Sequence, residues 1–193
     1  MNYFMFLRED GGVFGWGQDF VAEGRDQIPP DVTNAVALAN VFDYAGAVLD
    51  NGTISLWGNY CSDIYKSSVS GINNASNIVD GCGFSGFSVA ILRDNTVFAF
   101  GAGDSGQTNV PSGLTDVCEV AVGASHAVAL KNDGTVVAWG DDLYGSTNVP
   151  SSVFNAVSVA AGEFHSLAAL DYGEVVVWGE SLYGGTNVPD YAT

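Results

Sequence analysis

Short runs of apolar and β-branched residues, separated by tight turns, set the pattern of this chain. In one clear unit such runs occupy 117–122, 126–130 and 136–139, with Asp-Gly at 133–134 between the last two. Asp-Gly and Asn-Gly favour a type I′ hairpin turn, and β-branched residues favour strands. No window of ten or more residues combines helical spacing with helix caps. The pattern therefore predicts an all-β chain whose units each supply an inner strand, a two-stranded hairpin and a return loop that can add a short fourth strand.

This unit recurs along the chain. The stretch 120–150 returns almost unchanged at 159–189, and Trp139 and Trp178 mark the same position 39 residues apart. Three or four short antiparallel strands per unit are typical of a β-propeller blade, which buries its faces only by stacking on its neighbours. We therefore predict a single repeat domain over 1–193, a β-propeller of five repeats of about 40 residues with an aromatic residue packed between blades. The five copies are centred on Trp16, Trp57, Phe100, Trp139 and Trp178.

The first repeat is shorter than the others. Counting back from Trp16, the chain begins at the position that His126 holds in its own repeat, so the first blade lacks its inner strand. This count predicts four inner strands for five hairpins. An uncovered strand edge leaves backbone groups unsatisfied and invites association. Our hypothesis is that another chain covers this edge or that the ring does not close.

Three motifs point to a known repeat family. They are V-A-x-G-x-x-H-x-x-A-L at 120–130, N-D-G-T-V-V-A-W-G at 132–140, and Y-G-x-T-N-V-P at 144–150 and again at 183–189. Together they resemble the regulator-of-chromosome-condensation repeats, particularly the short bacterial and phage type. The resemblance implies a β-propeller. Relatives with this fold range from nucleotide-exchange factors to interaction scaffolds, so the resemblance does not specify a function.

Composition and charge exclude several partners. The chain has 22 acidic and only 5 basic residues, a formal net charge of −17, which repels nucleic acid and anionic membranes. No stretch approaches the length of a membrane span, and the first residues lack the features of a signal peptide. We therefore expect a soluble protein, in a virus particle or otherwise in the cytoplasm. The three cysteines have no zinc-binding spacing, so we predict no metal and no cofactor.

His126 and His165 are the most obvious candidates for chemistry. Tyr3, Tyr44 and Phe87 occupy the same repeat position, which indicates that the site selects a flat ring of this size. We therefore interpret both histidines as structural residues and predict no general base.

A nucleophile is equally poorly supported. Ser125 and Ser166 lie beside the histidines in the sequence, but neither belongs to a G-x-S-x-G elbow, and no acid is placed to orient the base. The G-x-G-x-x-G at 101–106 precedes no helix and aligns with ordinary repeat loops. The sequence therefore predicts a protein that is not an enzyme.

The acidic loops of the last two repeats are the candidate contact sites. Tyrosine suits contact with a protein or a sugar because it combines apolar area with a hydroxyl group. The alternative is that these tyrosines pack on the neighbouring blade. A calcium loop is not indicated because the D-x-D-x-D spacing is absent. The candidate residues for a partner or glycan are Tyr144, Tyr183, Asp141, Asp142, Asn148 and Asn187.

The favoured function is a non-enzymatic interaction propeller that serves as a structural or decorating subunit of a larger assembly, such as a virus or phage particle. The partners would be other protein subunits, including a chain that covers the open first-blade edge. A lectin-like carbohydrate-binding module is the alternative, and a nucleotide-exchange factor for a small GTPase is a third hypothesis. The residues assigned to structural repeat positions are His126, His165, Trp16, Trp57, Trp139 and Trp178.

Overall fold

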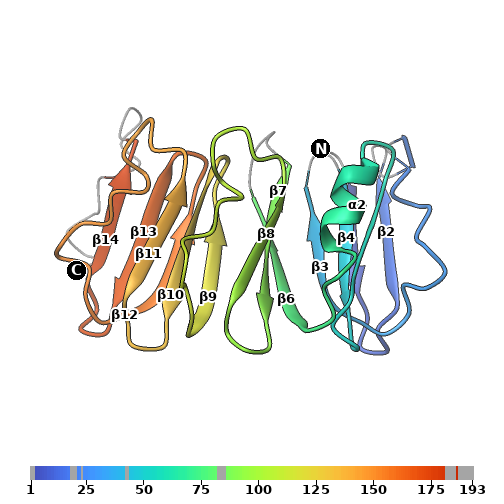
Figure 1. The fold of residues 1–193 in the computed structure, drawn as a ribbon, viewed down its shortest axis with the longest axis horizontal. Coiled ribbons are helices and arrows are strands. Elements are labelled where there is room, and N and C mark those ends of the chain that lie inside the picture. Colours follow the sequence, from blue (N-terminus) through green and yellow to red (C-terminus); the bar gives the residue numbers. More distant parts are fainter. Residues whose placement is uncertain are drawn as a thin grey trace.

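Five antiparallel sheets stand in a row in chain order in the computed structural model, and we call them blades 1 to 5 (Figure 1). The structure describes residues 3–17, 21–22, 24–41, 44–81, 86–180 and 186. The predicted all-β architecture of five repeats is confirmed. Blades 1 and 5 lie at opposite ends of the molecule (Figure 1).

Each complete blade has an inner, a middle and an outer strand. Blade 2 contains β3 (Ala35–Asn40), β4 (Ala45–Leu49) and β5 (Ile54–Trp57); blade 3 contains β6 (Ala75–Asp80), β7 (Phe87–Leu92) and β8 (Val97–Gly101). Blade 4 contains β9 (Val117–Val122), β10 (His126–Lys131) and β11 (Val136–Gly140); blade 5 contains β12 (Ala156–Ala161), β13 (His165–Leu170) and β14 (Val175–Gly179). In the described ranges no sheet has the optional fourth strand.

Among the described residues, blade 1 has two strands, β1 (Tyr3–Leu7) and β2 (Val13–Gly17). Phe4 pairs with Trp16 just as Ala127 pairs with Trp139 in blade 4, so β1 is equivalent to a middle strand. The predicted absence of an inner strand from the first blade is confirmed.

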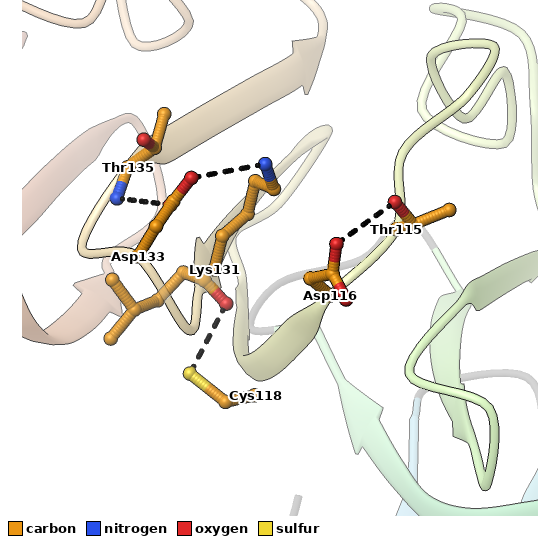
Figure 2. A network of polar contacts seen from close by, with 7 residues as sticks. Thr115, Asp116, Cys118, Lys131, Asp133 and Thr135 are labelled. Carbon is orange, nitrogen blue, oxygen red and sulfur yellow. Dashed lines mark hydrogen bonds and ion pairs between the residues drawn. The ribbon is translucent and has the colours of Figure 1, made fainter.

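The hairpin turns differ from the predicted type. A type I′ turn needs two successive residues with positive φ, but in blade 4 only Gly134 (φ 79°) has one. The Asp133 carboxylate accepts a hydrogen bond from Thr135 N at 3.0 Å and lies 3.3 Å from Lys131 Nζ (Figure 2). Lys131 N also bonds to Thr135 O at 2.9 Å. The prediction of type I′ was therefore wrong: the aspartate caps a three-residue loop that ends in one left-handed residue.

The turn of each blade also holds the start of the next blade. Gly134 O accepts a hydrogen bond from Ala156 N, the first residue of β12, at 3.1 Å. The same contact joins Gly52 O to Ala75 N at 3.0 Å. A Cβ on Gly134 would lie 2.9 Å from the Asn155 backbone, so this close approach favours glycine.

Side chains alternate between two faces of each blade. In β10, Ala127 and Ala129 pack against blade 3, and Val128 and Leu130 pack against blade 5. We call the face toward the preceding blade the upstream face and the opposite one the downstream face. Each junction is an apolar cluster that joins the downstream face of one blade to the upstream face of the next.

The upstream positions of the middle strands carry very small side chains in blades 2 to 5. All eight of these side chains are completely buried. Small residues are needed there because the bulkier downstream side chains of the preceding blade fill the space between the sheets. The four pairs are Ala45 and Ala47, Ser88 and Ala90, Ala127 and Ala129, and Ser166 and Ala168.

The short helix α2 (Asp63–Val69) contradicts the expectation of a chain without helices. The Ser62 side chain caps it by accepting a hydrogen bond from Tyr65 N at 3.3 Å, and Val69 is buried in the cluster between blades 2 and 3. With seven residues, it is too short to show helical spacing over ten or more residues, which is why the sequence pattern did not predict it. Among the described residues, no helix has the length and apolar character needed to cross a membrane.

Candidate interaction surface

Four aromatic side chains cover the upstream face of blade 1. Phe4, Phe6, Phe14 and Trp16, which we call the aromatic face, have exposed fractions of 61, 39, 43 and 55%. Phe6 stacks on Trp16 with 4.8 Å between ring centroids, and on Phe14 with 5.5 Å. With roughly half of each side chain exposed, the face presents about 300–500 Å² of apolar surface. A continuous patch of this size on a protein surface commonly marks an interaction site.

The sequence carried a signal for the aromatic face that the motif analysis missed. Phe4 and Phe6 stand where every other blade has alanine or serine, at positions that are completely buried in blades 2 to 5. The sequence reasoning identified the open strand edge of blade 1, but the structure shows that an entire sheet face is open beside it.

In three complete blades, the tryptophan is hydrogen-bonded to the loop that precedes the blade. Each donates its indole N–H to the backbone carbonyl of the residue 32 positions earlier, at 2.8 to 2.9 Å: Trp57 to Arg25, Trp139 to Gln107 and Trp178 to Ser146. All three rings are also buried in the junction with the preceding blade. Trp16 differs because its ring lies on the exposed aromatic face.

We expect Trp139→Phe to lower the free energy of unfolding by about 1–3 kcal/mol, because it removes a buried hydrogen bond and leaves Gln107 O unsatisfied. The ring itself fits, since Phe100 fills this position in blade 3. Trp16→Phe is the matched control and should change stability by less than about 0.5 kcal/mol. Denaturant unfolding of both variants tests this, and equal losses would contradict the role of the indole N–H.

His126 lies at the junction of blades 4 and 5, where it is only 2% exposed. Its Nε2 is 3.0 Å from Ser166 Oγ, and the Ser166 hydroxyl donates to Ser146 O at 2.8 Å. The single hydroxyl proton is thus already used, so Nε2–H donates to Ser166 Oγ. Ser166 is completely buried. A nucleophile must be reached by its substrate, and this serine is not accessible to one.

The same junction position recurs in other blades with matched partners. Tyr44 Oη lies 2.8 Å from Ser88 Oγ at the junction of blades 2 and 3, so a polar ring again meets a serine. At the junction of blades 3 and 4, Phe87 and Ala127 occupy the corresponding positions in one apolar cluster. Burial raises the pKa of Tyr44 and lowers the pKa of His126 to about 4, with the nearby His165 adding to the effect on His126. His126 is therefore neutral near pH 7.

His165 holds the same position in blade 5 and is half-buried on the downstream face. Its ring packs on Gly162, where an added Cβ would lie 2.3 Å from His165 Cε1. Gly123 meets the His126 ring in the same way at 2.3 Å. The G-x-x-H spacing thus reflects steric packing of the ring on the backbone.

The carboxylates of the loop after β11 accept hydrogen bonds from other residues of the same loop. The Asp142 carboxylate accepts hydrogen bonds from Thr147 N at 3.2 Å and Asn148 Nδ2 at 3.0 Å. Hydrogen bonds from Thr147, followed by that from Asn148, hold the pKa of Asp142 below its ordinary value. Asp141 Oδ1 accepts from Leu143 N at 2.9 Å. In the part of the chain that the structure describes, no group of three or more His, Cys, Asp or Glu side chains could hold a metal ion.

Tyr144 is 42% exposed and packs on Phe164 of the loop before β13, with 5.1 Å between ring centroids. The cavity beside it, which Asp141 and Glu163 also line, has a volume of about 10 Å³. This is room for about one water molecule and not for a sugar ring. Tyr183 and Asn187, the corresponding candidates of the last repeat, lie outside the described residues.

Comparisons with known proteins agree with this architecture. Residues 117–146 and 156–184 match the model of the Regulator of chromosome condensation (RCC1) repeat. None of the curated proteins matches the chain by sequence. The matched residues lie in blades 4 and 5, so these two blades are similar to this repeat.

Solved structures show the same fold. Prp20p from Saccharomyces cerevisiae is 21% identical, with a TM-score of 0.72 over 98% of this chain and 58% of its own. The ectodomain of the receptor kinase CR4 from Physcomitrella patens is 20% identical, with a TM-score of 0.71 over 97% of this chain and 52% of its own. Human WBSCR16 is 18% identical, with a TM-score of 0.67 over 97% and 62%. The chain thus spans between half and two thirds of these proteins and shares their fold, an array of β-propeller blades.

Proposed function

We propose that this RCC1-repeat propeller is a non-enzymatic protein-interaction module that serves as a structural or decorating subunit of a larger assembly. The observation that carries this proposal is the aromatic face. Its four aromatic side chains are exposed, although the equivalent faces of the other four blades are buried against a neighbour. Aromatic residues grouped in this way are the usual energetic centre of a protein interface.

Charge supports the aromatic face as the docking site. A chain with a formal charge of −17 repels other acidic proteins over most of its surface. The four side chains of the aromatic face are uncharged. At their rim, Arg8 is paired with Asp10 at 3.2 Å and lines an open depression of about 530 Å³ together with Glu9 and Asp10. A partner therefore meets no charged side chain on the aromatic residues themselves.

The histidines support a role without catalysis. His126 and Ser166 are enclosed between two blades and hydrogen-bonded to each other. Their arrangement matches that of Tyr44 and Ser88, a pair that cannot act as nucleophile and base. Both pairs are explained by packing at the blade junctions.

The structural similarity to Prp20p extends to fold and not to partners. The Prp20p structure was described together with its binding to Gsp1p and histones. At 21% identity the corresponding contacts cannot be transferred to this chain residue by residue. The virus or phage particle is our proposal for the host assembly, and detection of the chain in purified particles is the direct test.

A capture experiment tests the aromatic face. We expect the immobilised chain to retain a protein partner from extracts of its source cells, and Phe6→Ser to reduce that retention at least tenfold. Tyr172→Ser is the matched control because Tyr172 is an aromatic residue with a comparable exposed fraction, 53%, at the turn of blade 5. Retention that is equal for both variants would contradict the proposal.

A further inference from the structure

We infer that the aromatic face binds the downstream face of blade 5 in a second copy of this chain, head to tail. The inference rests on the proposed interaction function and names the partner of its main surface. The downstream face of blade 5 is formed by Leu167, Ala169, Val175 and Val177, all partly exposed. It ends the row of blades opposite the aromatic face (Figure 1).

The first argument is the construction of the internal junctions. All four join a downstream face to the upstream face of the next blade. Two faces are left over, the upstream face of blade 1 and the downstream face of blade 5. Because they lie at opposite ends of the row, they do not meet within one chain, but the blade 5 of one copy can meet the blade 1 of another.

The second argument is the size of the side chains. In the junction of blades 4 and 5, Leu130 faces a blade whose middle strand presents only Ser166 and Ala168. Phe4 and Phe6 replace such small residues in blade 1. A partner face with leucine or isoleucine at the position of Leu130 would therefore be overpacked against them. Blade 5 has Ala169 where blade 4 has Leu130. At this level the larger side chains of one face would meet a smaller side chain on the other, beside Leu167, which stands where blade 4 has Val128.

This contact is heterologous, because the two surfaces differ. Each added copy leaves one aromatic face and one blade 5 face open, so association continues until a ring closes or a filament grows. A decorating or structural subunit that polymerises in this way fits the assembly role proposed above.

Two blocking variants and their mixture test the inference by sedimentation velocity from about 1 to 100 μM. We expect the wild type to associate with increasing concentration, and Phe6→Glu and Ala169→Glu each to be monomeric over this range. An equimolar mixture of the two variants should form a one-to-one dimer, because each retains the face that the other has lost. Circular dichroism and thermal unfolding establish that each variant folds.

A wild-type monomer at 100 μM, self-association by Ala169→Glu alone, or a mixture that stays monomeric would each overturn the inference. A monomer that still captures a different protein through Phe6 would overturn it while the proposed function stands.

Discussion

We expect Ala129→Phe in blade 4 to lower the free energy of unfolding by about 3 kcal/mol. Ala129 is completely buried among Val89 and Ile91 of blade 3. A phenylalanine there would have to push two sheets apart, and overpacking of a close-packed core usually costs about 1–3 kcal/mol, with rigid sites at the upper end. Urea unfolding followed by tryptophan fluorescence measures the loss.

The reverse change at the matching position of blade 1 is the control. Phe6 is 39% exposed and keeps only its stacking with Trp16 and Phe14. Phe6→Ala should therefore cost about 1 kcal/mol, well below the loss that truncation of a fully buried phenylalanine causes. If blade 4 accepts phenylalanine as easily as blade 1 loses it, the distinction between internal and aromatic faces is wrong.

The repeat spacing was enough to predict the blades. Trp139 and Trp178 mark equivalent positions, and the short β-branched runs around them could pack only as stacked sheets. The sequence did not reveal why the aromatic is a tryptophan in most copies. That reason is the indole hydrogen bond to a carbonyl 32 residues earlier, as from Trp139 to Gln107, and a contact that distant leaves no local pattern.

The local errors have physical causes. The turn residue Asp133 suggested a type I′ turn because Asp-Gly is typical of one, but its carboxylate caps Thr135 N and stabilises a three-residue loop instead. Helix α2 was missed because seven residues are too few to give a periodic signal. The helix is stabilised by its serine cap and by the packing of Val69 between blades 2 and 3. Tertiary contacts thus decide both segments.

The candidate site was predictable in part. The missing inner strand of blade 1 follows from counting back from Trp16, and it lies at the same end of the molecule as the aromatic face. The aromatic face needed one further comparison, that of Phe4 and Phe6 with the small residues of the other copies. Its importance became clear only when the structure showed that these small residues are completely buried at the internal junctions.

We also expect the chain to lose about 3 kcal/mol of stability between pH 7 and pH 4 through His126 alone. Burial lowers the pKa of His126 from an ordinary 6.5 to about 4 in the folded chain. Below pH 6.5 the unfolded chain therefore binds a proton that the folded chain does not, so the free energy of unfolding falls as the pH drops toward 4. Each tenfold difference in proton affinity is about 1.4 kcal/mol, which gives the expected loss.

The chain itself supplies the control for this loss. His126→Phe combined with Ser166→Ala recreates the Phe87 and Ala127 pair of the neighbouring junction, so it should keep the packing and remove the titrating group. At pH 7 we expect this double variant to unfold within about 1 kcal/mol of the wild type. Between pH 7 and pH 4 it should lose about 3 kcal/mol less, since the contributions of Asp80 and the other carboxyl groups are common to both proteins. A double variant that loses as much stability as the wild type would show that His126 is not the acid-sensitive group of this junction, and a His126 imidazole that titrates near 6.5 by NMR would contradict its neutral, buried state directly.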